Sequence, residues 1–203
     1  MTKPTELSRR FDDALLFARR RHNTQYRKES PIPYIAHLLS TAALVLEAGG
    51  DEDMAIAGLL HDAIEDSEYT NATYEELVEK FGERVADIVR DCSDAEPAPG
   101  AAKEAWRPRK ERYIERLGTH DADSLLVSNA DKLHNARAVL ADYRDLGEDL
   151  WRRFNPDSDQ LWYYRALAQL FLERNSLLAE ELDRVVTELE HLVSLSRAHG
   201  HHP

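Results

Sequence analysis

Cysteine is almost absent from this chain: Cys92 is the only one among 203 residues. A single cysteine cannot form an internal disulfide, so the sequence excludes a disulfide-rich secreted scaffold. We therefore expect a reduced, cytoplasmic location, with Cys92 as an ordinary core residue on the apolar face of a helix. The first residues also lack the apolar stretch of a secretory signal, which fits the same expectation.

Long apolar runs and a surplus of basic residues are absent too. No run approaches the roughly 18 apolar residues that a membrane-spanning helix needs. Lysine and arginine number 26 against 38 aspartates and glutamates, which gives a formal net charge of −12. That charge argues against binding to nucleic acid or to a membrane surface. The net charge does not exclude a small anionic ligand, because a metal ion and a few local cations can make the electrostatic potential of one cleft positive.

Apolar residues at helical spacing dominate what is present. The alternation typical of a strand never persists beyond three or four positions. The sequence thus predicts an all-α fold, a single-domain helical bundle over residues 1–196 followed by a disordered tail at 197–203. The expected helices cover residues 6–22, 33–48, 53–66, 74–81, 85–92, 106–117, 123–145, 159–175 and 177–195. Residues 93–105, with two prolines and a glycine, form the candidate lid loop.

The run His61-Asp62-Ala63-Ile64-Glu65-Asp66 directly follows the apolar stretch Ala57-Gly58-Leu59-Leu60. Four groups that can bind a metal or move a proton therefore lie within six residues. Neighbouring His61 and Asp62 reach one ion only if both point into the same cavity. A helix would stack Glu65 and Asp66 one turn further on, at the rim of that cavity. An ordinary solvent-facing helix has no reason to carry this pattern.

Two other apolar helices carry isolated polar residues. His37 stands between Ala36 and Leu38, and Asp131 shares one helix face with Val127 one turn before it and Asn135 one turn after it. Burying an unpaired carboxylate costs several kcal/mol, so Asp131 needs a cation or a donor nearby. Taken alone, each has an ordinary explanation: a hydrogen-bonded core histidine, and an aspartate paired with a neighbouring Lys or Arg.

Taken together, these residues form a candidate metal centre. His37, His61, Asp62 and Asp131 supply two imidazoles and two carboxylates from three expected helices. This ligand set suits a borderline-to-hard divalent ion, and Mn²⁺, Fe²⁺ and Zn²⁺ all fit it. Coordination positions would remain for water and substrate, as in catalytic rather than structural sites. We therefore predict a catalytic metal site.

The motifs and their order resemble the HD superfamily of metal phosphohydrolases. The flanking residues are similar to one branch, the alarmone (ppGpp) hydrolase domains of RelA/SpoT proteins and their small stand-alone relatives. His61 to Asp66 matches the HDxxED signature of that branch, and Ala130 to Asn135 matches its ADKLHN motif. The stretch from His22 to His37 is similar to its first motif. The similarity spans about residues 11–165.

Three positions depart from the family pattern. Leu38 stands where a proline usually follows the ligand histidine, and Ala138 where Thr or Asp is common. The stretch Glu29-Ser30-Pro31 lacks the usual glycine after Arg-Lys. These departures concern the fit of the substrate more than the metal. The chain also ends before the synthetase and regulatory domains of the long proteins, so we expect a hydrolase-only protein.

The resemblance implies removal of the 3′-pyrophosphate of guanosine tetra- or pentaphosphate, giving GDP or GTP. Glu65 and Asp66 would orient the attacking water and protonate the leaving oxygen, in an assignment that the sequence leaves open. The expected partner is a small nucleotide, and the sequence is compatible with a homo-oligomer. The expected substrate-binding residues are Arg27, Lys28, Lys132, Asn135 and Tyr163.

Two alternative functions stay open at this stage. The first is another nucleotide phosphohydrolase, acting on an adenine alarmone, a nucleoside triphosphate or the 2′-phosphate of NADPH. The second, from a different class, is a non-catalytic, antitoxin-like binding protein. The complete set of candidate ligands and the Glu65-Asp66 pair count against the second alternative.

Overall fold

The computed structural model describes residues 4–64, 73–93 and 105–199 of the chain. These residues form helices joined by turns, and their β-structure is limited to one isolated bridge between Tyr26 and Pro33. The all-α prediction is therefore confirmed. The elements are α1 (Arg9–Arg21), α2 (Ile35–Glu47), α3 (Glu52–Leu60), α4 (Tyr74–Phe81), α5 (Glu83–Cys92), α6 (Trp106–Leu117), α7 (Ala122–Leu146), the 3-10 helix η1 (Gly147–Arg153), α8 (Gln160–Glu173) and α9 (Ala179–His199).

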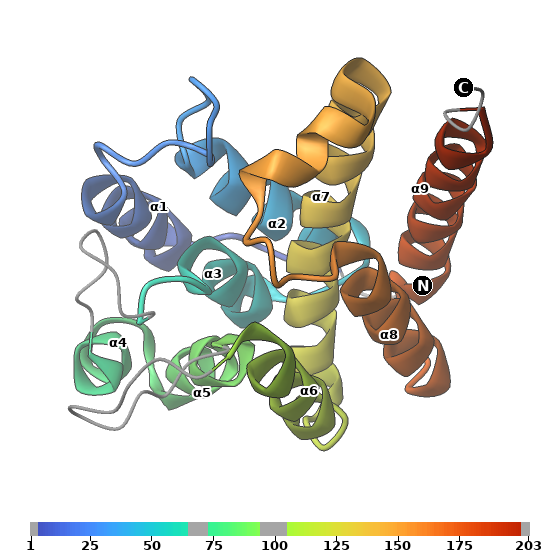
Figure 1. Cartoon of the computed structure of the whole chain (residues 1–203). Helices are drawn as coiled ribbons and strands as arrows, with labels where there is room; N and C mark the ends of the chain where they lie inside the picture. The colour runs from blue at the N-terminus through green and yellow to red at the C-terminus, as the bar shows by residue number, and fades with distance from the viewer. Residues whose placement is uncertain (1–3, 65–72, 94–104, 200–203) are drawn as a thin grey trace.

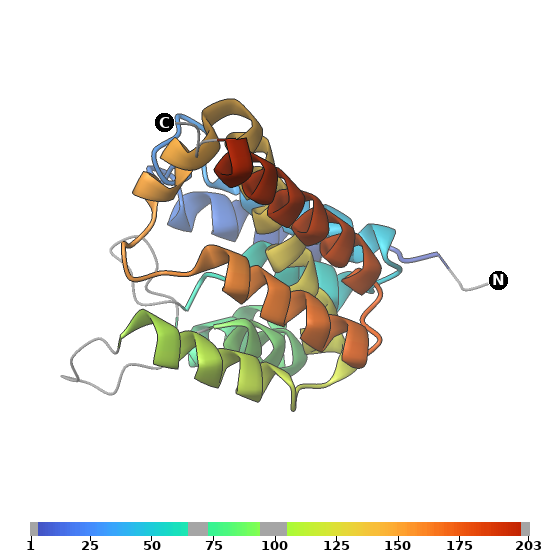
Figure 2. The same ribbon diagram turned by 45° about the vertical axis from the view of Figure 1, so that its right-hand side comes forward.

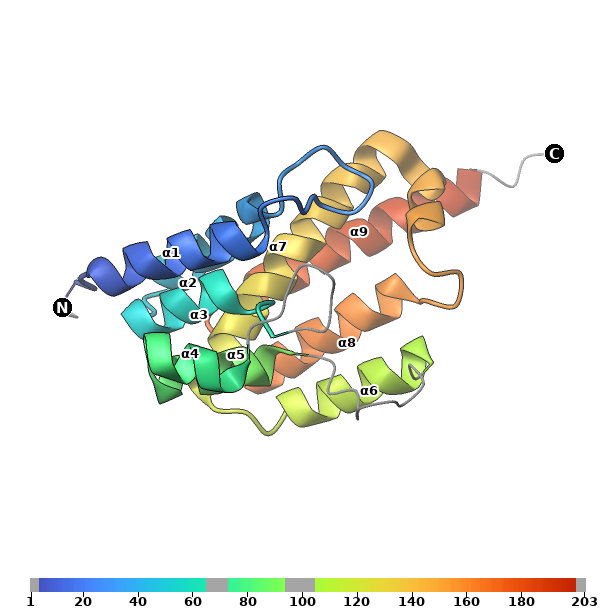
Figure 3. The same ribbon diagram turned by 90° about the vertical axis from the view of Figure 1, so that its left-hand side faces the viewer.

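Helix α7 runs through the middle of the molecule, with α1 to α3 on one side and α8 and α9 on the other (Figures 1 and 3). Figure 2 shows α6, α8 and α9 lying alongside one another. Because α7 packs against α2, α3 and α5 as well, side chains from these helices meet at its surface. None of the helices in the described ranges has the length and apolar character needed to cross a bilayer.

Side-chain caps and glycines set several helix boundaries, and those of α4 agree with the predicted range 74–81. The Thr73 hydroxyl accepts a hydrogen bond from the Glu76 amide at 3.1 Å and begins α4. Gly82, with φ of +92°, ends α4 and leads directly into α5. Asp51 caps α3 through the Met54 amide, and Asp121 caps α7 through the Ser124 amide.

Helices α2 and α3 approach each other closely at Gly58. A Cβ atom at this position would lie 3.1 Å from Cα of Ala42, so only a glycine allows this spacing without a shift of the backbone. The residues of α3 from Ala55 to Leu60 are all buried, so this half of the helix lies within the core. Cys92 is buried as well, which confirms it as a core residue.

The predicted helix over 53–66 is too long at its C-terminus. Helix α3 ends at Leu60, and residues 61–64 form a turn. The reason is local: the His61 ring nitrogen Nδ1 lies 2.9 Å from the Gly58 carbonyl oxygen and takes the acceptor that a continuing helix would use. The Ala63 amide bonds instead to the Leu60 carbonyl. His61 and Asp62 therefore lie in a turn, not within a helix.

Two further expectations concern the ends and loops of the chain. Helix α9 continues to His199, so residues 197–199 are helical where a disordered tail is expected. Glu65, Asp66 and most of the 93–105 loop lie outside the described residues. The role of that loop as a lid and the domain bounds 1–196 stay predictions.

Candidate active site

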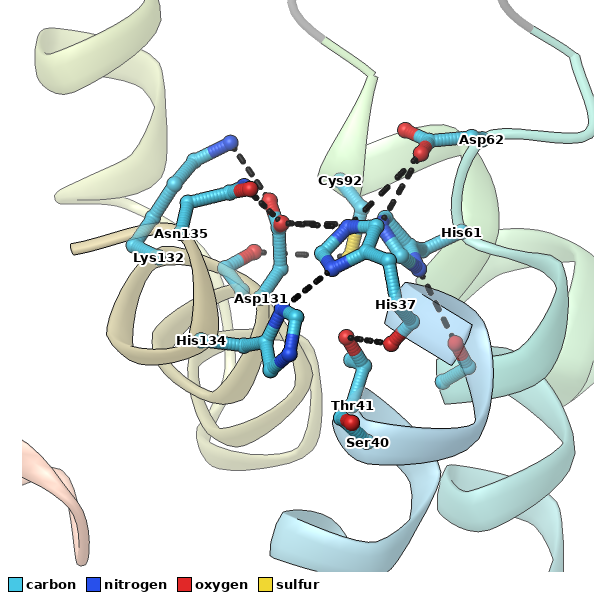
Figure 4. Close-up of polar contacts among 12 residues, drawn as sticks. His37, Ser40, Thr41, His61, Asp62, Cys92, Asp131, Lys132, His134 and Asn135 are labelled. Atoms are coloured by element: carbon cyan, nitrogen blue, oxygen red, sulfur yellow. Dashed lines mark hydrogen bonds and ion pairs between the residues drawn. The ribbon is translucent and has the colours of Figure 1, made fainter. Parts of the chain in front are cut away.

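The four candidate ligands lie together at the junction of α2, α3 and α7 (Figure 4). Nε2 of His37 is 3.2 Å from Nε2 of His61 and 3.2 Å from Oδ1 of Asp131. Nε2 of His61 is 3.2 Å from Oδ2 of Asp62 and 3.5 Å from Oδ1 of Asp131. Oδ2 of Asp62 is 4.0 Å from Nε2 of His37. Two imidazoles and two carboxylates thus face one small space.

The donor set fits a divalent cation. The side chains of His37 and His61 are 1% and 2% exposed, and that of Asp131 is 6% exposed. Buried carboxylates need a compensating positive charge; Lys132 supplies part of it to Asp131, and a divalent ion would supply the rest. The Nδ1–H of His61 donates to the Gly58 carbonyl, so its Nε2 lone pair faces the cluster, as in the outer-shell arrangement common for metal-bound histidines.

The two carboxylates favour a positive charge in the space between the four candidate ligands. Burial alone would lower the pKa of His61, but the carboxylates of Asp62 and Asp131 raise it well above its usual value. Burial alone would raise the pKa of Asp131, yet Lys132 and His61 hold it well below its usual range. His61 likewise lowers the pKa of Asp62 against the effect of burial. The two carboxylates therefore stabilise either a proton on His61 or a divalent cation.

Neighbouring polar side chains donate hydrogen bonds to the carboxylates of Asp62 and Asp131. Asn135 donates to Oδ1 of Asp131 at 2.6 Å, and Lys132 donates to Oδ2 at 2.6 Å. The Tyr34 hydroxyl donates to Oδ2 of Asp62. Lys132 and Asn135 are predicted substrate-binding residues, and the structure brings both into direct contact with a candidate ligand.

Arg27 and Lys28 lie on the loop before α2, which lines a hollow of about 840 Å³ formed by residues 24–31 and Tyr34. Nη2 of Arg27 lies 2.8 Å from Oδ1 of Asn135, so this loop reaches the candidate metal centre. Nζ of Lys28 lies 5.8 Å from the centre of the Phe154 ring. Arg27 thus lies beside the cluster, whereas Lys28 lies near Phe154, and binding of an anionic ligand by either residue stays a prediction.

Tyr163, also expected to contact substrate, is buried within an aromatic group between α6 and α8. Its ring lies 5.9 Å from Trp106, and Nζ of Lys110 lies 4.7 Å from its centre. Tyr163 is only 5% exposed and packs against these neighbours. Its contact with a substrate stays a prediction.

Tyr34 and His134 touch candidate ligands, a role that the sequence did not predict. The Nδ1 atoms of His134 and His37 lie 2.8 Å apart, and Tyr34 bonds to Asp62. Each residue lies three positions from a candidate ligand, Tyr34 before His37 and His134 after Asp131. The helical spacing of His134 from Asp131 was a usable signal, because it places both side chains on one face. Glu65 and Asp66, the expected acid and base, lie outside the described residues.

The chain matches a known protein family over most of its length. The family model described as "HD domain" matches residues 14–155. The chain belongs to the HD-domain family. HD-domain membership implies dependence on a divalent metal ion, and the His37, His61 and Asp62 cluster has the ligand atoms to hold one, all within 4.8 Å of one another.

Several relatives of this HD-domain chain have names that state an activity. Guanosine-3′,5′-bis(diphosphate) 3′-pyrophosphohydrolase MESH1 of Xenopus tropicalis is 37% identical over 128 residues, which are 62% of this chain and 66% of that protein. The bifunctional (p)ppGpp synthase/hydrolase SpoT of Escherichia coli K12 is 31% identical over 191 residues, 93% of this chain and 24% of that protein. The HD-domain chain thus spans less than two thirds of the length of these curated relatives.

Solved structures resemble this HD-domain chain over most of its length. One is described as "A metazoan ortholog of SpoT hydrolyzes ppGpp and plays a role in starvation responses", with a TM-score of 0.71, 25% identity, and coverage of 91% of this chain and 97% of that one. Another, lmo0812 from Listeria monocytogenes EGD-e, has a TM-score of 0.61 and 29% identity, and covers 74% of this chain and 96% of that one.

Proposed function

We propose that this chain is a metal-dependent hydrolase that removes the 3′-pyrophosphate of guanosine tetra- or pentaphosphate, giving GDP or GTP and pyrophosphate. The observation that carries the proposal is the convergence of four candidate ligands: Nε2 of His37 and Nε2 of His61 lie 3.2 Å apart, and each lies 3.2–4.0 Å from an oxygen of Asp62 and of Asp131. The named activities of the relatives supply the substrate class.

In this proposal His37, His61, Asp62 and Asp131 hold one Mn²⁺ ion, with Fe²⁺ and Zn²⁺ as alternatives. When bound, such an ion supplies Lewis acidity and lowers the pKa of a coordinated water towards neutrality. The protein keeps the ligand atoms in place through Asn135, which bonds to Asp131.

The cations of the cleft would bind and orient the substrate. Arg27 presents a planar guanidinium at the hollow before α2, where it can stack on a purine or bond to phosphate. Lys28 adds positive charge at the same loop. Asn135 and Lys132 would each contact the ribose or a phosphate while keeping Asp131 in place. Tyr163 would flank the substrate.

Proton transfer is assigned to Glu65 and Asp66 on the sequence pattern alone. One acid would orient the attacking water, and the other would protonate the leaving oxygen of the nucleoside. The prediction to test is that Asp62→Ala loses both turnover and the metal, whereas Glu65→Ala loses turnover and keeps the metal. Equal loss of metal in both variants would show that Glu65 is misassigned.

A nucleotide panel with Mn²⁺ tests the proposal and its rivals. The products of ppGpp, pppGpp, an adenine alarmone, GTP and NADPH are separated by chromatography, and phosphate release is measured with malachite green. Pyrophosphate from ppGpp supports the proposal. Orthophosphate from NADPH would point to another phosphohydrolase, and no product from any nucleotide would point to a binding protein. The cytoplasmic location and a homo-oligomer stay predictions.

A further inference from the structure

The two candidate histidine ligands are held in different ways. Nδ1 of His61 lies 2.9 Å from the Gly58 carbonyl oxygen, which can only accept a hydrogen bond. Nδ1 of His61 therefore carries the proton, and the main chain fixes this tautomer. Nδ1 of His37 instead lies 2.8 Å from Nδ1 of His134, a ring nitrogen that can donate or accept. The tautomer of His37 thus depends on another side chain.

A hydrogen bond between these two Nδ1 atoms holds one proton, and its position decides what His37 can bind. If His37 carries it, His37 has a free lone pair at Nε2. If His134 carries it, a neutral His37 must be protonated at Nε2. That nitrogen lies 3.2 Å from Asp131 and 3.2 Å from His61, so its hydrogen would occupy the space where the candidate ligands converge. Only the first arrangement lets His37 bind a cation there.

We infer that His134 is a positioning residue for metal binding: its Nδ1 accepts the Nδ1–H of His37 and leaves Nε2 of His37 free for a divalent cation. This inference rests on the metal site of the proposed function. His134 lies on α7 three residues after Asp131, whereas His37 lies on α2. Helix α7 therefore supplies one candidate ligand directly and orients a second one on a neighbouring helix (Figure 4).

Ring packing is the competing explanation for this contact. The rings of His37 and His134 have centroids 4.9 Å apart with 34° between their planes, so His134 could serve only as a filler. Two substitutions separate the explanations. His134→Phe keeps an aromatic ring but has no acceptor, whereas His134→Asn loses the ring and keeps an acceptor oxygen near the position of Nδ1.

The test measures Mn²⁺ binding to the full chain after treatment with a chelator, by isothermal titration and by the EPR signal of free Mn²⁺. Loss of an outer-shell partner weakens metal binding by roughly 10- to 100-fold, so we expect this loss in His134→Phe and near wild-type affinity in His134→Asn. His191→Phe, at an exposed position of α9, is the matched control and should bind Mn²⁺ like the wild type. Thermal melting without metal checks that each variant folds.

A second readout does not depend on metal. In the metal-free protein with ¹⁵N-labelled histidine, the ring signals of His37 should show the proton on Nδ1 in the wild type and in His134→Asn. Wild-type Mn²⁺ affinity in His134→Phe, or equal loss in His134→Phe and His134→Asn, would overturn the inference. A wild type that binds no Mn²⁺ would overturn both the inference and the proposed function. A wild type that binds Mn²⁺ but hydrolyses no nucleotide would overturn only the proposed function.

Discussion

Nη2 of Arg27 lies 2.8 Å from Oδ1 of Asn135, 108 residues further along the chain. The other side-chain atom of the same amide, Nδ2, lies 2.6 Å from Oδ1 of Asp131. Asn135 therefore connects the loop before α2 to a candidate metal ligand. If Arg27 binds the substrate as proposed, a substrate that changes its contact with Asn135 would also affect Asp131, so we expect substrate binding and the orientation of Asp131 to be coupled.

Asn135→Ala should lower kcat/KM for the nucleotide substrate by roughly 10- to 100-fold, because hydrogen bonds to charged groups contribute about 1.5–3 kcal/mol each. The variant removes the contacts to both Arg27 and Asp131. Steady-state kinetics with ppGpp and saturating Mn²⁺ measure the effect. Asn155→Ala, in an exposed turn before α8, is the control and should leave kcat/KM unchanged. Wild-type kinetics in Asn135→Ala would contradict this prediction.

Metal binding should raise the thermal stability of the protein. A ligand at 100 times its Kd stabilises the folded state by about 2.7 kcal/mol. For a chain of this size, that corresponds to a rise in Tm of roughly 5–10 °C, measured by scanning calorimetry. EDTA should reverse the rise. Asp131→Asn, compared with its own metal-free form, should show little or none, and an equal rise in both proteins would place the ion elsewhere.

Glu29→Gly should stabilise the protein. Glu29 adopts φ of +51°, a left-handed conformation that costs a residue with a side chain about 1–2 kcal/mol. Part of the gain is offset by the flexibility of glycine in the unfolded chain, so we expect the free energy of unfolding to rise by about 0.5–1 kcal/mol in urea denaturation.

The matched control for this change is Glu29→Ala. Both substitutions remove the exposed ion pair with Arg153 at 3.6 Å, which contributes little, but alanine retains the strained backbone. The free energy of unfolding of Glu29→Ala should therefore stay at or slightly below that of the wild type. Equal stability in the glycine and alanine variants would show that the backbone at this position stores no strain.

Cys92 should resist thiol reagents in the folded protein. Burial raises the pKa of its thiol to about 11, so the reactive thiolate stays scarce at pH 8 and becomes abundant only as the pH approaches that value. Reaction with a chromogenic disulfide reagent at pH 8 should be slow until urea unfolds the chain. In a Ser194→Cys variant the added thiol, at an exposed position of α9, should react at once. Rapid reaction of wild-type Cys92 would contradict its burial.

Local signals predicted the helices well where the chain carries its own start and stop residues. Helices α4 and α6 have the predicted bounds, Tyr74–Phe81 and Trp106–Leu117, and Thr73 and Gly82 frame α4. The candidate ligands were found because imidazoles and carboxylates are unusual on apolar helices, and the structure brings all four together. Their role as ligands stays a prediction.

Three features of the structure could not be predicted from helical periodicity. The end of α3 at Leu60 depends on His61 taking the Gly58 carbonyl, a choice that helical periodicity does not encode. The contact of His134 with His37 depends on how α7 packs against α2. The left-handed backbone of Glu29 was also hidden, because glutamate rarely adopts it, although the missing glycine at this stretch was a hint.

Gly58 takes part in the candidate site without a side chain of its own. Its carbonyl orients His61, and its missing Cβ lets α2 and α3 approach at Ala42. A side chain at position 58 is therefore expected to move α2 away from α3, and His37 away from His61. The ionic radius that the candidate site would accept should then change with every candidate ligand left in the sequence.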